Sequence, residues 1–130
     1  MTTALWCILA AGLLPYGFTI AAKSGRGFNN HAPRAYLDQV EGWRQRAHWA
    51  QLNSFEGLAL FIGAVLTSHV VGGDEFTTNA LAVVYVVARA LYGLMYITDQ
   101  AKMRSLMWFV AMFANAGLFV TAATTTAALG

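Results

Sequence analysis

Two ionisable side chains, Glu56 and Arg89, lie within long apolar stretches of this sequence. A charged group in hydrocarbon is costly, and it therefore usually has a partner or a function. If both stretches are helices that enter a membrane from the same surface, Glu56 lies about 13 Å deep and Arg89 about 12 Å deep, at 1.5 Å per residue. The matching depths predict an ion pair, which either holds two helices together or shapes a polar site.

Further polar side chains follow Glu56 and Arg89 at helical spacing. Arg46 and Asn53 precede Glu56 by ten and three residues, which places all three on one stripe of a helix. Arg89 shares a second stripe with Tyr85, Tyr92 and Tyr96. This stripe leads towards three polar residues at the membrane surface, Lys102, Arg104 and Ser105. Such a cationic and phenolic pocket suits a small anionic molecule whose reaction partner is lipid-soluble.

The composition indicates that membrane helices position these residues. The sequence is 58% apolar and 11% charged, whereas soluble domains carry roughly 25% charged residues. About 20 mostly apolar residues are needed to cross a bilayer, and four stretches qualify: residues 4–22, 47–71, 80–97 and 106–129. Because residues 1–3 carry no cation, the first stretch is expected to be a span and not a cleaved signal. We expect an all-α integral membrane four-helix bundle that forms one domain over residues 1–130.

The cations predict the orientation of this bundle. Two loops carry nearly all of them, the first with Lys23, Arg26, Arg34, Arg44 and Arg46 and the third with Lys102 and Arg104. The second loop, residues 67–79, and both termini have none. Loops one and three should therefore be cytoplasmic. Within the first loop, apolar residues at helical spacing after Pro33 predict that the second long helix begins near that proline and projects above the membrane.

The sequence also contains a nucleotide-cyclase-like string and three histidines, but their context favours neither a cyclase nor a metal site. Residues 72–76 spell GGDEF, but in a short loop between two spans this string is best interpreted as a turn with two solvated acids. His31, His48 and His69 fall on different loops or faces, so we expect no metal site. The sequence contains no basic run with interleaved aromatic residues, which makes nucleic acid an unlikely partner.

Several of these residues together resemble the signature of the MAPEG superfamily, which contains microsomal glutathione transferases and membrane synthases of eicosanoid metabolism. The likeness covers nearly the whole chain in order and spacing. It is carried by Arg46-Ala47-His48, by residues 50–56 (AQLNSFE) with Leu60-Phe61, and by Val84-Tyr85, Ala88-Arg89, Tyr92, Tyr96 and Arg104-Ser105. The preceding Gly42-Trp43-Arg44 is similar to the bacterial branch of the superfamily, and this favours a bacterial inner membrane as the location.

The resemblance implies a homotrimer that binds glutathione as co-substrate between adjacent subunits, near the cytosolic face. It implies a transferase or peroxidase that acts on a lipophilic small molecule. By this likeness Arg104 stabilises the glutathione thiolate and Ser105 is a second donor to the sulfur. The residues expected to bind glutathione are Arg46, Gln51, Asn53, Glu56, Arg89, Tyr92 and Tyr96.

Three departures from the family pattern keep an alternative open. Trp49 stands where an arginine is usual, Gly57 where a tyrosine often follows the glutamate, and Ala59 where a proline is often found. Arg46, one turn before Trp49, is the expected substitute for the missing arginine. The alternative is a non-catalytic, lipid-binding member of the superfamily. A proton-coupled drug exporter fits less well, because residues 4–22 contain no acid.

Overall fold

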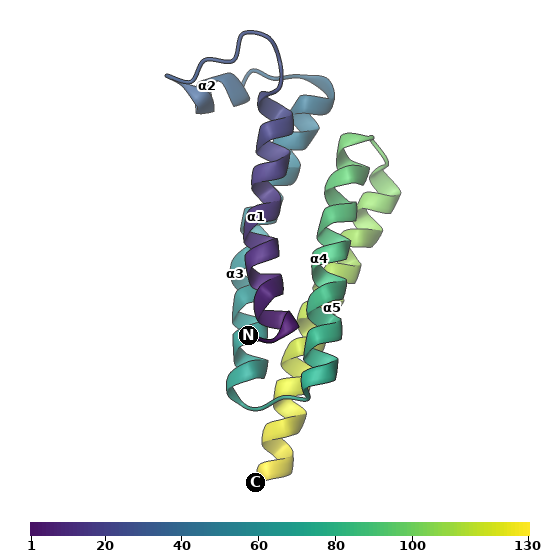
Figure 1. Ribbon diagram of the computed structural model, residues 1–130. Coiled ribbons are helices and arrows are strands. Elements are labelled where there is room, and N and C mark those ends of the chain that lie inside the picture. Colours follow the sequence, from purple (N-terminus) through teal and green to yellow (C-terminus); the bar gives the residue numbers. More distant parts are fainter.

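A computed structural model of the chain consists of four long helices and one short helix (Figure 1). It describes residues 1–130, apart from the side chain of Leu129. The helices are α1 (Thr3–Lys23), α2 (Pro33–Leu37), α3 (Gly42–Val70), α4 (Glu75–Ile97) and α5 (Ala101–Leu129). All except α2 are long and apolar enough to cross a membrane. The predicted all-α membrane bundle is therefore confirmed.

Three of the long helices begin earlier than the apolar stretches that predicted them. α3, α4 and α5 each start five residues before the expected positions 47, 80 and 106. Their first turns are polar, as Thr77 and Lys102 illustrate, so a hydropathy criterion leaves these turns out although the backbone is already helical. The extra turns matter because one of them contains Arg104.

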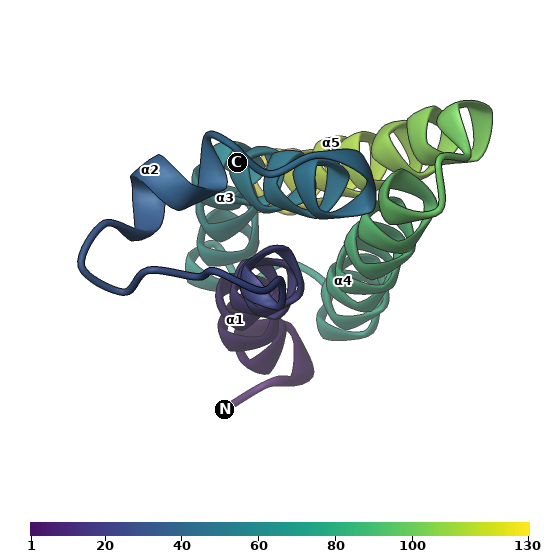
Figure 2. The ribbon, with the colours of Figure 1, turned by 90° about the horizontal axis from the view of Figure 1, so that it is seen from above.

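The long helices run up and down, so the connections collect at the two ends of the bundle. α1 packs mainly on α3, and α4 packs mainly on α5. Figure 1 shows α2 and the α4–α5 turn at one end, with the α3–α4 turn and both chain termini at the other. Seen from above, the same end carries the α1–α3 connection that extends outward through α2 (Figure 2). The two cation-rich loops thus lie at the same end.

The first loop corrects one expectation. A helix does begin at Pro33, but it ends at Leu37, and α3 begins only at Gly42. Leu37 is buried in a small cluster with Ala22 and Ala47, which turns this segment back onto the bundle. Gly42 has a φ of 62°, a conformation that glycine adopts without strain. The predicted continuous extension of the second long helix from Pro33 is therefore wrong.

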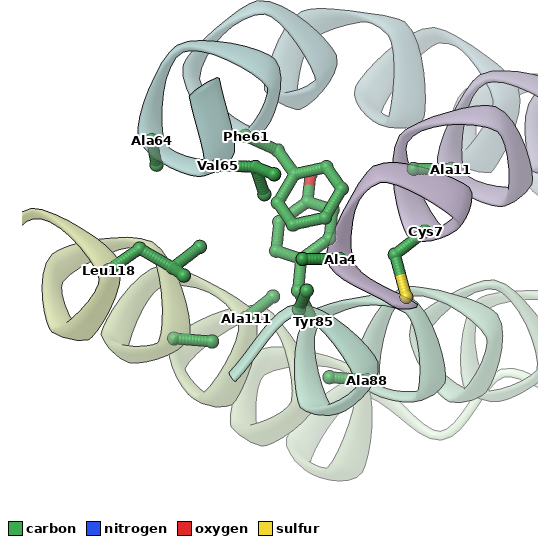
Figure 3. Close-up of a cluster of buried hydrophobic side chains, with 12 residues drawn as sticks. Ala4, Cys7, Ala11, Phe61, Ala64, Val65, Tyr85, Ala88, Ala111 and Leu118 are labelled. Carbon is green, nitrogen blue, oxygen red and sulfur yellow. The ribbon is translucent and has the colours of Figure 1, made fainter. Parts of the chain in front are cut away.

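A cluster of buried side chains joins α1, α3, α4 and α5 (Figure 3). At its centre the Phe61 ring stacks on the Tyr85 ring, with centroids 3.9 Å apart and planes 5° apart. Small side chains such as Ala4 and Ala11 let α1 approach this pair, as is usual where membrane helices pack closely. The stacked pair fixes α3 against α4 one turn from Arg89, and so it positions the polar residues discussed below.

Gly93 provides a test of the α1–α4 packing. A Cβ atom at Gly93 would overlap the buried Phe18 ring of α1, whereas a Cβ atom at Gly12 meets nothing within 4 Å. Both glycines are helical, so the gain in helix propensity on mutation to alanine is similar. We therefore expect Gly93→Ala to be less stable than Gly12→Ala by about 1–3 kcal/mol, the usual effect of overpacking. Unfolding of both variants in detergent measures the difference, and equal stabilities would contradict the packing.

Residues 72–76 form the turn between α3 and α4 and the cap of α4. Gly72 has a φ of 74°, and Asp74 accepts hydrogen bonds from the Thr77 backbone N–H at 2.8 Å and from the Thr77 Oγ1 at 2.6 Å. The bonds from Thr77 hold the pKa of the Asp74 carboxyl below its ordinary value. In this structure the GGDEF string is a turn and a helix cap.

Acid is expected to loosen the first turn of α4. Because the folded-state pKa of Asp74 lies below its unfolded value of about 3.9, the cap stabilises fully above that value and is lost as the pH falls through the lowered folded-state pKa. Hydrogen exchange at the Thr77 amide should therefore accelerate below about pH 4. In Asp74→Asn, which has no carboxyl to protonate, the exchange should lack this acid step. The same acid step in both proteins would contradict this role for Asp74.

Candidate functional site

Asn53 lies at the centre of a hydrogen-bonded relay between α3 and α4. Arg89 donates from Nη2 to the Asn53 Oδ1 at 2.8 Å and to the Ser54 Oγ at 3.3 Å. The Asn53 Nδ2 in turn donates to the Glu56 Oε2 at 3.2 Å. Arg89 is only 4% exposed, so these bonds fix a buried cation. They also orient the Asn53 amide towards Glu56.

The relay corrects the predicted ion pair. Among the described side chains, Arg89 is joined to Glu56 only through Asn53. The neutral oxygens of Asn53 and Ser54 lie within reach of the guanidinium, while the Glu56 side chain is exposed at the surface of the subunit. The direct contact predicted from matching depths is therefore wrong, although both residues belong to the same site.

Three adjoining pockets share Asn53 as a lining residue. One lies among α3, α4 and α5 and includes Glu56 and Arg89. A second lies over α3 and α4, next to Tyr92 and Tyr96. The third reaches the start of α5, and its lining includes Asn53, Tyr92, Tyr96, Arg104 and Ser105. Residues that the sequence placed on three separate helices therefore converge on one polar region.

Cations and tyrosine rings alternate along this region. The Arg89 guanidinium lies over the Tyr92 ring at 4.2 Å, and the Arg104 guanidinium lies over the Tyr96 ring at 4.4 Å. The two rings meet edge to face, with centroids 5.6 Å apart. Contact with aromatic faces favours a guanidinium that is partly removed from water. The series therefore holds Arg104 at the polar end of the bundle, in a defined position above the tyrosines.

The position of Arg104 follows from the α4–α5 turn. Asp99 has a φ of 61°, and this residue reverses the chain so that α5 begins at Ala101, beside the end of α4. Arg104 and Ser105 therefore lie in the first turns of α5, where the helix dipole adds positive potential. The cation and the helix end together favour an anion in the third pocket.

Arg46 and Gln51 have other contacts within the subunit. Arg46 donates from Nε to the backbone carbonyl oxygen of Ile97 at 3.1 Å, at the end of α4. The Gln51 Oε1 lies 3.2 Å from the His48 Nδ1. In the part of the chain that the structure describes, neither residue lines the three pockets. Their role in ligand binding stays a prediction.

The site also contains Trp108 and Asn115, which the sequence reasoning did not assign to it. Both line the pocket next to Arg89. A signal for them was present, because Arg104, Trp108 and Asn115 are separated by four and seven residues and so share one face of a helix. Asn115 lies within residues 106–129, the stretch that the sequence predicts as the last span.

Comparison with protein-family models gives a match to the MAPEG family over residues 3–124. The match covers nearly the whole chain, including α1, α3 and α4, most of α5 and every residue of the site. The chain belongs to the MAPEG family. Comparison with curated proteins gave no match. Membership makes this MAPEG protein an integral membrane protein of a family associated with glutathione and eicosanoid metabolism, and it confirms the resemblance noted in the sequence.

Proposed function

We propose that this MAPEG protein is a glutathione-dependent transferase or peroxidase that acts on lipophilic electrophiles. The observation that carries the proposal is the third pocket, where Arg104 and Ser105 lie beside Tyr92, Tyr96 and Asn53. A cation and a hydroxyl at the polar end of a membrane bundle suit a thiolate. The other polar groups suit the remainder of a small charged peptide.

The residues present fit glutathione, which has two carboxylates, one ammonium group and one thiol. Glu56 is an exposed acceptor that suits the ammonium group, and the hydroxyls of Tyr92 and Tyr96 are donors that suit carboxylates. Arg89 lies behind Asn53 and orients its amide through the 2.8 Å bond. The donor and acceptor set therefore matches the ligand without Arg46 or Gln51.

Arg104 and Ser105 would prepare the sulfur for reaction. When bound, glutathione supplies the nucleophilic sulfur, which is far more reactive as a thiolate than as a thiol. A fixed guanidinium favours the thiolate and lowers the pKa of the bound thiol. The Ser105 hydroxyl would donate a second hydrogen bond. Trp108 and Phe109 line the same pocket and give a lipophilic substrate an apolar approach to the sulfur.

The proposal includes a homotrimer in a bacterial inner membrane, with the cation-rich end facing the cytoplasm. Trp49 and Glu56 line the second pocket and lie exposed on the surface of one subunit. A neighbouring subunit would cover this face and complete the site, with the ligand held between the two subunits. The gathering of both cation-rich loops at one end (Figure 1) supports the orientation.

A second candidate, a non-catalytic lipid-binding protein, is favoured by Trp49. This side chain is 43% exposed, and its ring lies 6.2 Å from that of Tyr96. An arginine is expected there from the family resemblance. A tryptophan at the mouth of the pocket contributes apolar surface in place of a charge, and this suits a lipid more than a peptide.

Calorimetry on the purified protein in detergent separates the two candidates. The enzyme proposal predicts saturable glutathione binding that Glu56→Gln weakens about tenfold or more, since a charge-assisted bond is worth about 1.5–3 kcal/mol. Turnover of a lipophilic aryl halide and of a lipophilic hydroperoxide then separates transferase from peroxidase. If the protein binds lipophilic molecules but shows no heat with millimolar glutathione, the second candidate is correct.

A further inference from the structure

A second polar pocket lies between the end of α1 and the start of α3, outside the candidate site. It has a volume of ≈ 430 Å³, within the range of pockets that hold small molecules. Two arginines, a glutamate and a tyrosine line it: Arg26, Arg44, Glu41 and Tyr36. Figure 2 shows that the connection between α1 and α3 extends outward from the bundle, away from α4. This pocket is therefore separate from the polar region around Asn53.

The pocket lies at the depth of lipid head groups. α1 has 21 residues, so it measures about 31 Å at 1.5 Å per residue, close to the ~30 Å thickness of the hydrocarbon core. Arg26 follows the last residue of α1 by three positions. Trp43, which precedes Arg44, is 40% exposed, and tryptophan is enriched where hydrocarbon meets water. A molecule in this pocket would therefore lie in the head-group layer of the leaflet at this end.

Arg44 reaches from α3 to the loop that follows α1. Its guanidinium lies over the Trp43 ring at 4.6 Å. A Cβ atom at Gly25 would lie 3.1 Å from the Arg44 Nε and would overlap the Tyr36 hydroxyl, so glycine lets both side chains approach the loop backbone. Because the Arg44 Nε is itself buried, a ligand in the pocket is left with the two outer nitrogens of the guanidinium.

The charges that line this pocket do not pair with one another. Glu41 is the N-cap residue of α3, yet its side chain makes no capping hydrogen bond. Across the described part of the chain, no ion pair joins Glu41 to Arg26 or Arg44, although all three line the same pocket. Two cations and a separate carboxylate complement a ligand that carries both a negative and a positive group. A phosphate diester joined to a primary ammonium group has this character.

We propose that this pocket binds the head group of an aminophospholipid, with Arg26 and Arg44 donating to the phosphate and Glu41 accepting from the ammonium group. Guanidinium groups bind phosphate oxygens through parallel N–H donors, and basic pockets at a membrane surface bind lipid head groups. This lipid is distinct from the lipophilic substrate, and its binding needs neither glutathione nor Arg104. It would hold the connection between α1 and α3 against the membrane surface.

Native mass spectrometry of the full chain from detergent micelles tests this proposal, with phosphatidylethanolamine and phosphatidylcholine of the same acyl chains as probes. The two lipids carry the same net charge, but only the ammonium group of phosphatidylethanolamine has N–H donors. Lipid bound by the double variant Arg26→Gln/Arg44→Gln is subtracted as the background from other lipid contacts. We expect phosphatidylethanolamine to bind at least about fivefold more tightly, as for one hydrogen bond to a charged group.

Glu41→Gln should reduce this preference to within about twofold. Retained binding of phosphatidylcholine in this variant shows that it is folded. Asp38→Asn is the matched control, because Asp38 is an exposed acid three residues earlier that does not line the pocket, and it should keep the preference. Arg26→Gln should weaken both lipids by about five- to tenfold, whereas Arg34→Gln, which removes an exposed cation of α2, should weaken neither.

Equal binding of the two lipids, a preference that Glu41→Gln retains, or no binding above the double variant would overturn the proposal. Glycerophosphoethanolamine, the same head group without acyl chains, distinguishes a lipid from a soluble phosphate ester. It should displace phosphatidylethanolamine only at concentrations at least about tenfold higher, because it lacks the acyl chains that add apolar contact. Displacement at equal concentrations would assign the pocket to a soluble ester and overturn its assignment to a lipid.

Discussion

Arg104→Ala is expected to lower kcat/KM for the glutathione-dependent reaction by about 10²–10³-fold, the usual effect of removing one donor aimed at developing or existing negative charge. Arg104 is the cation in the pocket with Ser105, and the Tyr96 ring holds it at 4.4 Å. Alanine at this position leaves the sulfur as a neutral thiol at pH 7. Steady-state kinetics with a lipophilic electrophile at saturating glutathione measures the change.

Lys102→Ala is the matched control for this prediction. Lys102 is an exposed cation two residues earlier in α5, so its removal changes the net charge by the same amount but leaves the pocket intact. Its kcat/KM should stay near that of the unmodified protein. The rate of Arg104→Ala should rise with pH as the thiol ionises unaided, towards its ordinary range near pH 8.5. Equal losses in the two variants, or a pH profile that Arg104→Ala leaves unchanged, would remove Arg104 from thiolate stabilisation.

Arg89→Leu is expected to destabilise the bundle by about 2–4 kcal/mol, because it removes charge-assisted bonds to two buried or half-buried oxygens. The structure also predicts which contacts of Arg89 account for this loss of stability. Arg89 contacts Asn53 at 2.8 Å, whereas Glu56 is reached only through Asn53. The coupling energy of Arg89 with Asn53 should therefore exceed its coupling with Glu56.

Two double-mutant cycles measured by unfolding in detergent test this difference. The cycle of Arg89→Leu with Asn53→Leu should give a coupling of about 1.5–3 kcal/mol. The cycle with Glu56→Gln should give less than about 1 kcal/mol, as for a partly solvated pair. A larger coupling with Glu56 than with Asn53 would restore the direct ion pair and contradict the relay. Additive effects in both cycles would show that the relay contributes nothing to stability.

The sequence predicted the helices well because membrane solvent imposes a strong rule. A chain in hydrocarbon must satisfy its own backbone hydrogen bonds, so long apolar stretches such as residues 4–22 and 80–97 become helices. The polar first turns were missed because hydropathy does not detect a helix that continues into water. Helix α2 was mistaken for part of α3 because the burial of Leu37 against Ala22 is a tertiary contact that periodicity does not contain.

The candidate site was predictable to the extent that helical spacing determines a face. Tyr92, Tyr96 and Arg89 share a stripe and do line the pockets. The spacing predicted similar depths for Glu56 and Arg89, and both residues do lie at one site. It could not show which oxygen atom the Arg89 guanidinium reaches. That choice depends on side-chain reach, and Asn53 with Ser54 lies closer. Arg46 shares the stripe of Asn53, yet it caps the end of α4 at Ile97, since a long side chain can bind a free carbonyl group that its spacing does not reveal.

The ionisation state of bound glutathione tests the central claim most directly. The ultraviolet difference spectrum of the purified protein with and without glutathione, recorded at neutral pH, reports thiolate by its absorbance. The account predicts a thiolate band that saturates with the calorimetric binding curve, persists in Lys102→Ala and is absent in Arg104→Ala although glutathione still binds. Glutathione that binds as a neutral thiol to the unmodified protein, or a thiolate band that Arg104→Ala retains, would contradict it.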